Sequence, residues 1–224
     1  MDDVVARPVA RAWELTGGDL HDRGVAEAVR AEFIPLLAEL PGHLGAILLV
    51  DRGRRLMRGV SFWTDPDARN AAGTILAPRI EVAIEVSQAT FRGTWLFDVG
   101  FSRFRGKARV DSDGAAEEID PMLVRVAVFE DGTAAEPAMV DLFRSHLATT
   151  TDLPGCLGSL MLVDRDRATV IAGSMWTDAD AAERTKALAA DSFRAIVEAT
   201  GSTSPATQMG TFEVLENRPI PRLV

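Results

Sequence analysis

The sequence predicts an α+β fold made of two tandem βαββαβ units with antiparallel sheets, and three observations favour this interpretation. The chain repeats itself: residues 40–68 align without a gap with residues 153–181, 113 positions later, and 16 of the 29 aligned positions are identical. A period close to half the chain length indicates one structural unit that is present twice. Each half also shows the same succession of strand and helix patterns, and a hairpin signal stands at the same place in both.

Each half is expected to begin with a strand followed by a helix. Residues 8–15 are extended in character, and a clearer β-branched run at 123–129 is their counterpart in the second half. Helices are predicted at about 19–40 and about 134–150, where apolar residues recur at helical spacing. Pro35 is expected to kink the first helix or to end its regular part.

Two strands joined by a tight turn come next in each half. They are predicted at 44–50 and 56–63, and again at 157–163 and 169–176, and both turns begin with Asp-Arg. The first of these strands is apolar on both faces. We therefore expect it to be covered by helices on one face and by a second sheet on the other.

A second helix and a last strand complete each unit. Thr-Asp-x-Asp opens both helices, at 64–67 and 177–180, and a Thr followed three residues later by Asp predicts a capping box. The helices are expected to end near positions 90 and 199, with an interruption at Pro78 in the first. Strands at 94–101 and 208–215 then complete βαββαβ, which is the ferredoxin-like arrangement.

A charged region separates the two units. Residues 102–121 are poor in apolar side chains, which is typical of a linker. The predicted domains are therefore residues 1–101 and residues 122–224.

The bulk composition excludes several classes of partner. The net charge of −9 repels phosphate backbones and anionic lipids, so neither nucleic acid nor a membrane is an expected partner. The N-terminus lacks the pattern of a signal peptide, and no apolar run approaches the roughly 20 residues that span a bilayer. The lone cysteine, Cys156, suits a reducing compartment and favours a cytoplasmic protein. Its counterpart is His43, so no metal or thiol site is expected at this position in both halves.

Two motifs accompany the ferredoxin-like order in both halves. Pro-Gly-x-x-Gly precedes the second strand at 41–45 and 154–158, and Trp-Thr-Asp closes the third strand at Trp63 and Trp176. This pattern resembles the antibiotic biosynthesis monooxygenase (ABM) family. The resemblance implies the dimeric α/β barrel of that superfamily, in which two four-stranded sheets pair. Here one chain would supply both sheets as an intramolecular barrel, and a further homodimer of the tandem chain stays open.

The resemblance also implies two chemistries. Some members of the family oxidise polycyclic phenols with dioxygen and without a cofactor, and others degrade haem held by a His of the second helix beside a Trp and an Asn. Of these residues only the Trp carries over, onto Trp63 and Trp176. The chain contains no tyrosine, and its histidines are His21, His43 and His146, none of them in a predicted second helix. Haem ligation of the family type is therefore not expected, and neither a cofactor nor a metal is predicted.

The candidate ligand-binding residues are the four tryptophans and one arginine: Trp13, Trp63, Trp95, Trp176 and Arg58. Trp63 and Trp176 either stack on a flat substrate or pack between a helix and the sheet. Trp13, whose counterpart is assigned as Val128, and Trp95 occur only in the first half. The first half is therefore the one expected to keep a pocket.

Arg58 and Trp63 are the candidate catalytic residues. Arg58 lies within the third strand, where the other half has an apolar residue, and a buried arginine needs a partner. It would hold a phenolate or carboxylate, or it would pair with a carboxylate such as Asp98. Alternation along the strand predicts that Gly59, Ser61 and Trp63 share one face and that Arg58 lies on the other.

Two functions from different classes follow. The first is a cofactor-independent monooxygenase that acts on a small aromatic or polyketide-like molecule, with Arg58 stabilising negative charge. The alternative is a non-catalytic small-ligand-binding or assembly module that has lost the catalytic residues of the family. Convergence of Trp13, Trp63, Trp95 and Arg58 on one cavity would favour the first function.

Overall fold

The computed structural model describes residues 8–104, 122–130, 135–184, 186 and 208–217. The chain forms two compact units. Of the described residues, unit 1 comprises those up to Asp98 and those from Val214 onward, and unit 2 comprises those from Val99 to Glu213.

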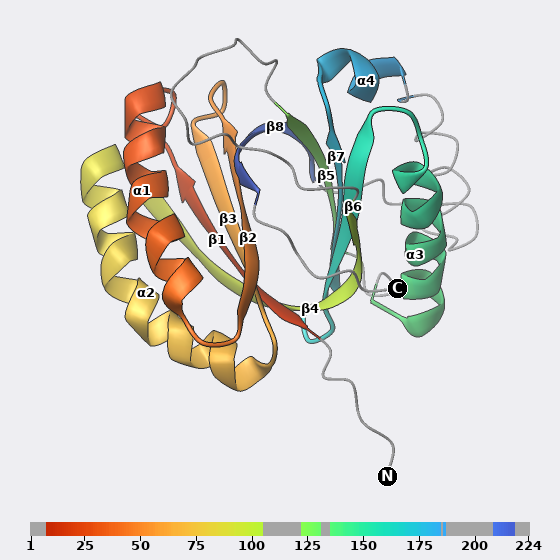
Figure 1. Cartoon of the computed structure of the whole chain (residues 1–224), viewed down its shortest axis with the longest axis horizontal. Helices are drawn as coiled ribbons and strands as arrows, with labels where there is room; N and C mark the ends of the chain where they lie inside the picture. Colours follow the sequence, from red (N-terminus) through yellow and green to blue (C-terminus); the bar gives the residue numbers. More distant parts are fainter. Residues whose placement is uncertain (1–7, 105–121, 131–134, 185, 187–207, 218–224) are drawn as a thin grey trace. The chain divides into compact units, whose positions relative to one another are not determined.

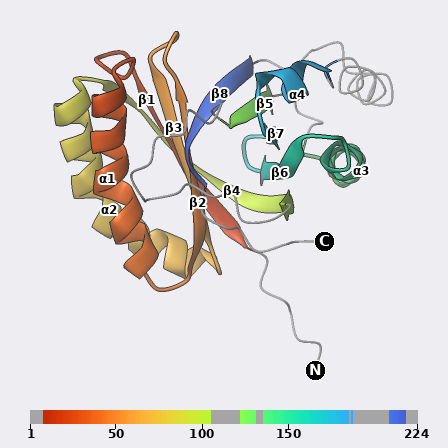
Figure 2. The same cartoon turned by 45° about the horizontal axis from the view of Figure 1, so that its top comes forward.

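Unit 1 has the predicted order of elements, with four antiparallel strands and two helices. These elements are β1 (Val9–Thr16), α1 (Arg23–Glu39), β2 (His43–Asp51), β3 (Leu56–Trp63), α2 (Pro66–Ser87) and β4 (Thr90–Phe104). The strands pair in the order β4-β1-β3-β2, as a ferredoxin-like unit requires. Both helices lie side by side on one face of this sheet (Figures 1 and 2). We call this side the helix face of unit 1.

The core of unit 1 fills the space between this face and the helices. It includes Trp13 and Met57 from the strands and Phe33 and Leu76 from the helices, all at most 7% exposed. Strand β2 is buried on both faces from Gly45 to Val50, which confirms the burial expected from its sequence.

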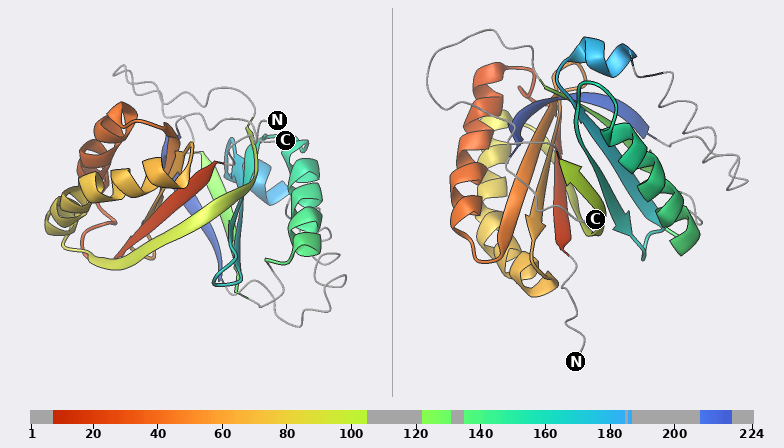
Figure 3. Two further views of the ribbon diagram at one scale, coloured as in Figure 1. Left: turned by 90° about the horizontal axis from the view of Figure 1, so that it is seen from below. Right: turned by 45° about the vertical axis from the view of Figure 1, so that its right-hand side comes forward.

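Unit 2 has the same order of strands. Its elements are β5 (Leu123–Phe129), α3 (Pro137–Thr151), β6 (Cys156–Asp164), β7 (Thr169–Trp176), α4 (Ala179–Arg184) and β8 (Gln208–Asn217). The order is β8-β5-β7-β6, and α3 packs on β6 and β7 (Figure 3, right). Phe129 and Phe143 meet in its core, with their ring centroids 4.7 Å apart.

Two strands contribute residues to both units. Strand β4 is long (Figure 3, left), and its Val99–Phe104 part belongs to unit 2. The Val214–Asn217 end of β8 belongs to unit 1, where Leu215 joins the core cluster of Trp13. In hydrogen-bonding order the described strands form the closed barrel series β1-β3-β2-β8-β5-β7-β6-β4.

Several predicted boundaries are wrong. Pro35 does not end α1, and Pro78 does not interrupt α2, because each helix has enough packed residues on both sides of its proline. The other expectation for Pro35, a kink, stays a prediction. Strand β4 begins four residues earlier and ends three residues later than the predicted 94–101. The predicted linker therefore starts inside β4, and its remaining residues, 105–121, lie outside the described residues. The second helix of unit 2 is described only as far as Arg184 and at position 186.

The predicted capping box is also corrected. The N-cap of α2 is Asp65, whose carboxylate accepts a hydrogen bond from the Ala68 N–H at 2.9 Å. Thr64 supports this cap by donating its hydroxyl to Asp65 at 2.7 Å. Unit 2 repeats both contacts with the corresponding residues.

Candidate functional site

Trp63 and Trp176 have matching structural surroundings in the two units. Both are fully buried, and each indole N–H donates to the serine hydroxyl two residues earlier, Ser61 or Ser174, at 3.0 Å. The ring of His43 lies against Trp63, with a centroid distance of 5.2 Å. A repeated, satisfied indole is what packing between helix and sheet requires.

Trp13 also lies on the helix face of unit 1. Its ring stacks on Phe33 with a centroid distance of 4.9 Å and an interplanar angle of 25°. It passes directly over Gly59 of the neighbouring strand, where an added Cβ would overlap the indole.

Arg58 and Trp95 lie on the opposite face of the sheet. The register pairs Glu14 with Arg58 and Ala12 with Trp95, one residue out of phase with Trp13 and Gly59. Arg58 Nε donates to Glu14 Oε2 at 2.7 Å, so its partner is Glu14 and not the expected Asp98. The candidates of unit 1 therefore divide between two faces and do not converge, because alternate residues of a strand point to opposite sides.

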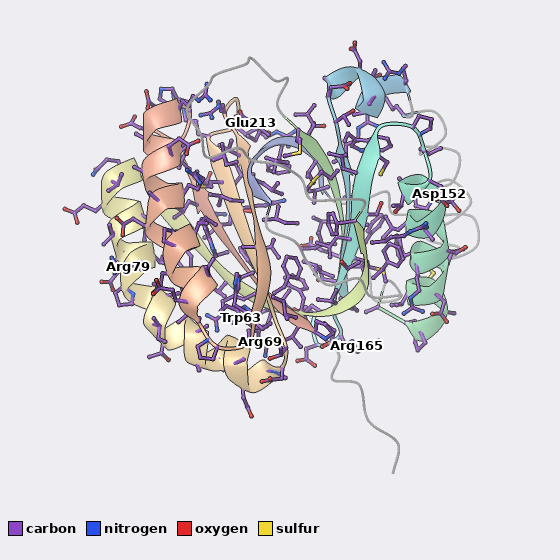
Figure 4. All side chains as sticks on the ribbon, viewed as in Figure 1. Trp63, Arg69, Arg79, Asp152, Arg165 and Glu213 are labelled. Carbon is purple, nitrogen blue, oxygen red and sulfur yellow. The ribbon has the colours of Figure 1, made fainter. Side chains whose placement is uncertain are left out.

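A different set of polar residues comes together on the helix face of unit 1. Arg11 of β1 lies directly opposite Ser61 and diagonally from Trp63. Its guanidinium group covers Gly73 of α2, at a place where any Cβ would collide with it. Arg69 lies one turn before Gly73 on α2. In Figure 4 the labelled Arg69 and Trp63 lie at the same end of unit 1. Asp98 of β4 shares this face, since it is paired with Val9.

The electrostatics of this cluster are those of a partly desolvated cationic site. Burial lowers the pKa of Arg11, and the charge of Arg69 lowers it further. Burial also lowers the pKa of Arg69, an effect that Asp98 opposes. Both groups remain cationic because an arginine is protonated at any physiological pH. Arg69 thus interacts electrostatically with a second guanidinium group, that of Arg11, and with the carboxylate of Asp98.

The hydrogen-bonding capacity of Arg11 is incompletely used. Its Nε is buried and has no hydrogen-bond partner among the residues that the structure describes. A planar guanidinium offers donors that match a carboxylate, phenolate or enolate oxygen. The arrangement can therefore hold an oxyanion beside the apolar core of unit 1.

Unit 2 contains a related cluster. The register places Leu123 opposite Trp176, as Val9 is opposite Trp63, so Arg125 corresponds to Arg11 and again lies opposite a serine. By the same comparison Glu213 corresponds to Asp98, since Asp98 is paired with Val9 and Glu213 is paired with Leu123. Burial lowers the pKa of Arg125, and the charge of Glu183 opposes this shift.

This correspondence was not apparent from the sequence. Matching Trp13 with Val128 displaces the first strands by one residue, whereas the strand pairing makes Ala127 the counterpart of Trp13. One signal in the sequence could have shown the correct alignment: each first strand has an arginine two residues after its start, Arg11 in β1 and Arg125 in β5. The correct comparison also makes Gly210 the counterpart of Trp95.

The described residues contain no group of three or more side chains suited to a metal ion. Burial lowers the pKa of His146 on α3. No helix among the described residues has the length and apolar character needed to cross a bilayer.

Solved structures share the fold of this chain along almost its whole length. A candidate monooxygenase from Fusobacterium nucleatum subsp. nucleatum has a TM-score of 0.71 at 14% identity, with 97% of each chain covered. An anthrone oxidase-like protein has a TM-score of 0.62 at 14% identity, with 94% of this chain and 92% of that chain covered. For a candidate monooxygenase from Lactobacillus acidophilus these values are 0.58, 13% and 93% of each chain. No family model and no curated protein sequence matches the chain.

Proposed function

Because the chain has the fold of ABM-related proteins of the dimeric α+β barrel superfamily, as its sequence motifs predict, we propose that it is a cofactor-independent monooxygenase acting on a small aromatic or polyketide-like molecule. The observation that carries this proposal is the partly buried Arg11–Arg69 pair on the helix face of unit 1. The structural similarity to a candidate monooxygenase and to an anthrone oxidase-like protein supports the reaction class.

The proposed reaction converts a methylene group flanked by aromatic rings into a ketone. The substrate loses a proton to give an enolate, whose oxygen would be held by Arg11 and Arg69. Asp98 is the carboxylate of this cluster and would take the proton. The carbanion carbon then bonds to dioxygen, and proton uptake gives a hydroperoxide. Cleavage of its O–O bond with loss of the C–H proton forms the ketone and releases one water.

The residues have distinct roles in this proposal. Arg11 and Arg69, in place of Arg58, would stabilise the negative charge of the substrate, because Arg58 already forms an ion pair with Glu14. Trp13, which is stacked on Phe33, would form the apolar side of the site.

The alternative function is a non-catalytic module that binds a small ligand or serves assembly. One observation favours it: the indole N–H groups of Trp63 and Trp176 are both satisfied internally, as in residues kept for packing. In this case the cationic pair would bind an anion without turnover.

Oxygen uptake with anthrone separates these functions. We expect wild-type protein to consume one dioxygen per anthrone and to form anthraquinone, with no effect of a chelator. Arg69→Gln should lower the rate by at least about tenfold, since it removes charge stabilisation worth more than about 1.4 kcal/mol. Arg79→Gln changes an exposed arginine of the same helix that is paired with Glu32, so it is the matched control and should retain the rate. Uptake no faster than the uncatalysed reaction would reject the oxygenase.

A further inference from the structure

The equivalent arginines Arg11 and Arg125 have different charged neighbours in the two units. In unit 2, Arg125 donates to the carboxylate of Glu183 at 3.4 Å. The same carboxylate accepts from Lys186 at 3.0 Å. Unit 2 therefore supplies an anion to its arginine from its own second helix.

Unit 1 lacks that internal anion. At the repeat distance of 113 residues, Asn70 occupies the place of Glu183, and its amide oxygen faces Arg69 at 3.4 Å. Arg69 itself stands where unit 2 has an alanine, and Gly73 stands where unit 2 has Lys186. Unit 1 has thus exchanged a carboxylate for a neutral amide and has added a second guanidinium group.

These differences leave unit 1 with two guanidinium groups and one nearby carboxylate, Asp98, so one positive charge is in excess next to an apolar core. The two arginines repel one another, and a bound anion would remove this repulsion while using the donors of Arg11. The missing side chain at Gly73 gives the guanidinium its place beneath α2. Leu96, which lies opposite Arg11 at the β4 edge, is 39% exposed, so this side of the cluster is near solvent.

We propose that unit 1 binds one aromatic oxyanion per chain at Arg11 and Arg69, and that unit 2 does not, because Glu183 already provides the equivalent carboxylate from within the chain. The identity of residue 70, asparagine in place of glutamate, then decides which unit accepts a ligand. This inference rests on the proposed function, in which the bound substrate carries an anionic oxygen once its proton is lost.

Binding of 2-naphthoate, compared with that of its uncharged methyl ester, tests the inference by calorimetry. We expect one naphthoate site per chain and at least about tenfold weaker binding of the ester, since the ester lacks the charge. Asn70→Glu should weaken naphthoate binding by about tenfold or more, because the new carboxylate would occupy Arg11 as Glu183 occupies Arg125. Asn70→Gln, which keeps the neutral amide, should bind as the wild type does.

Arg125→Ala gives a second arm in the other unit. It should leave naphthoate affinity and stoichiometry unchanged, with folding verified by circular dichroism for every variant. Equal affinity for acid and ester, equal binding by Asn70→Glu and Asn70→Gln, or loss of the site in Arg125→Ala would each overturn the inference.

The two proposals fail separately. Naphthoate binding that depends on residue 70, without any oxygen uptake from anthrone, would keep the anion site and reject the oxygenase. Oxygen uptake that is the same in Asn70→Glu and Asn70→Gln, without naphthoate binding, would keep the oxygenase and reject the anion site.

Discussion

At the scale of single residues, the tryptophans of the repeat are anchored by serine. A buried indole N–H needs an acceptor, and Ser61 and Ser174 provide it at the same distance in both units. The short side chain of serine also leaves space for the ring that lies on the same face of the strand. Recurrence of this pair in two units with different cationic clusters indicates that it stabilises the fold rather than a ligand.

Ser61→Ala should destabilise the protein because it leaves the indole N–H of Trp63 buried without an acceptor. We expect a loss of about 1–3 kcal/mol in the free energy of unfolding, measured by urea denaturation. In a Trp63→Phe background the same substitution should cost clearly less, since no donor remains. An equal cost in both backgrounds would show that the hydrogen bond has no stabilising role.

Gly59→Ala should be destabilising because the new methyl group collides with the ring of Trp13. That ring is held by its stacking on Phe33 and cannot move aside cheaply. We expect a loss of about 1–3 kcal/mol, as for other overpacked cores. Gly173→Ala is the control, since its Cβ would meet its nearest atom at an ordinary 3.6 Å.

The counterpart positions support this prediction and offer a rescue. Unit 2 has Ala172 at the position of Gly59 and Ala127 at that of Trp13, so it accepts the methyl group where the large ring is absent. Gly59→Ala should therefore cost less when combined with Trp13→Ala than in the wild type. Equal costs in the two backgrounds would exclude the collision as the cause.

At the scale of elements, the second helix of each unit begins at an aspartate cap. Asp65 accepts from the Ala68 N–H, and Asp178 accepts from the Ala181 N–H. Hydrogen bonds from these backbone groups are the main cause that lowers the pKa of both carboxyls, followed by the hydroxyl of the preceding threonine. The charge also suits the positive end of the helix.

Asp65→Asn should reduce the pH dependence of stability. Because the pKa of Asp65 is lower in the folded state, its contribution is complete above the unfolded value of about 4 and is lost as the pH falls through the folded value. The wild type should therefore be more stable than Asp65→Asn at pH 7, and the difference should shrink toward pH 2. Urea midpoints across this range provide the measurement, and a constant difference would contradict it.

At the scale of the whole molecule, the two units are not consecutive pieces of chain. The end of β8 returns to unit 1, more than a hundred residues after the rest of that unit, and Leu215 completes its core at 7% exposure. Such a contact joins distant parts of the sequence, so cutting the chain near Asp98 would leave unit 1 without part of its core.

Leu215→Ala should destabilise unit 1 even though the substitution lies near the C-terminus. Loss of a buried leucine costs about 2–5 kcal/mol, and faster hydrogen exchange should appear in β2 of unit 1. Leu96→Ala, at an exposed leucine of the same unit, should change stability by less than about 0.5 kcal/mol. Similar effects of the two substitutions would show that β8 does not support unit 1.

Strong local periodicity explains which elements could be predicted. The third strand, 56–63, was correct at both ends, because a tight turn and the Trp-Thr-Asp motif delimit it. The expected interruption at Pro78 was wrong, and α1 continues past Pro35, since packing along the rest of each helix outweighs a local helix breaker. The additional residues of β4 depend on a partner strand that no local pattern reveals.

The candidate site was harder to predict than the fold. Alternation correctly separated Arg58 from Trp63, but composition could not show that Glu14 already neutralises Arg58. Arg11 and Arg69 lie in different elements, 58 positions apart in the sequence, and neither has a distinctive motif. Their proximity depends on how α2 crosses β1.

By itself, the sequence determined the repeat, the order of strands and helices, and the alternation of faces, because all three are written in short-range spacing. Only the tertiary structure decided which arginine is neutralised, which lies beneath a helix glycine, and which strand completes which unit. Those outcomes depend on strand register and on contacts between residues far apart in the chain, and local sequence patterns predict neither.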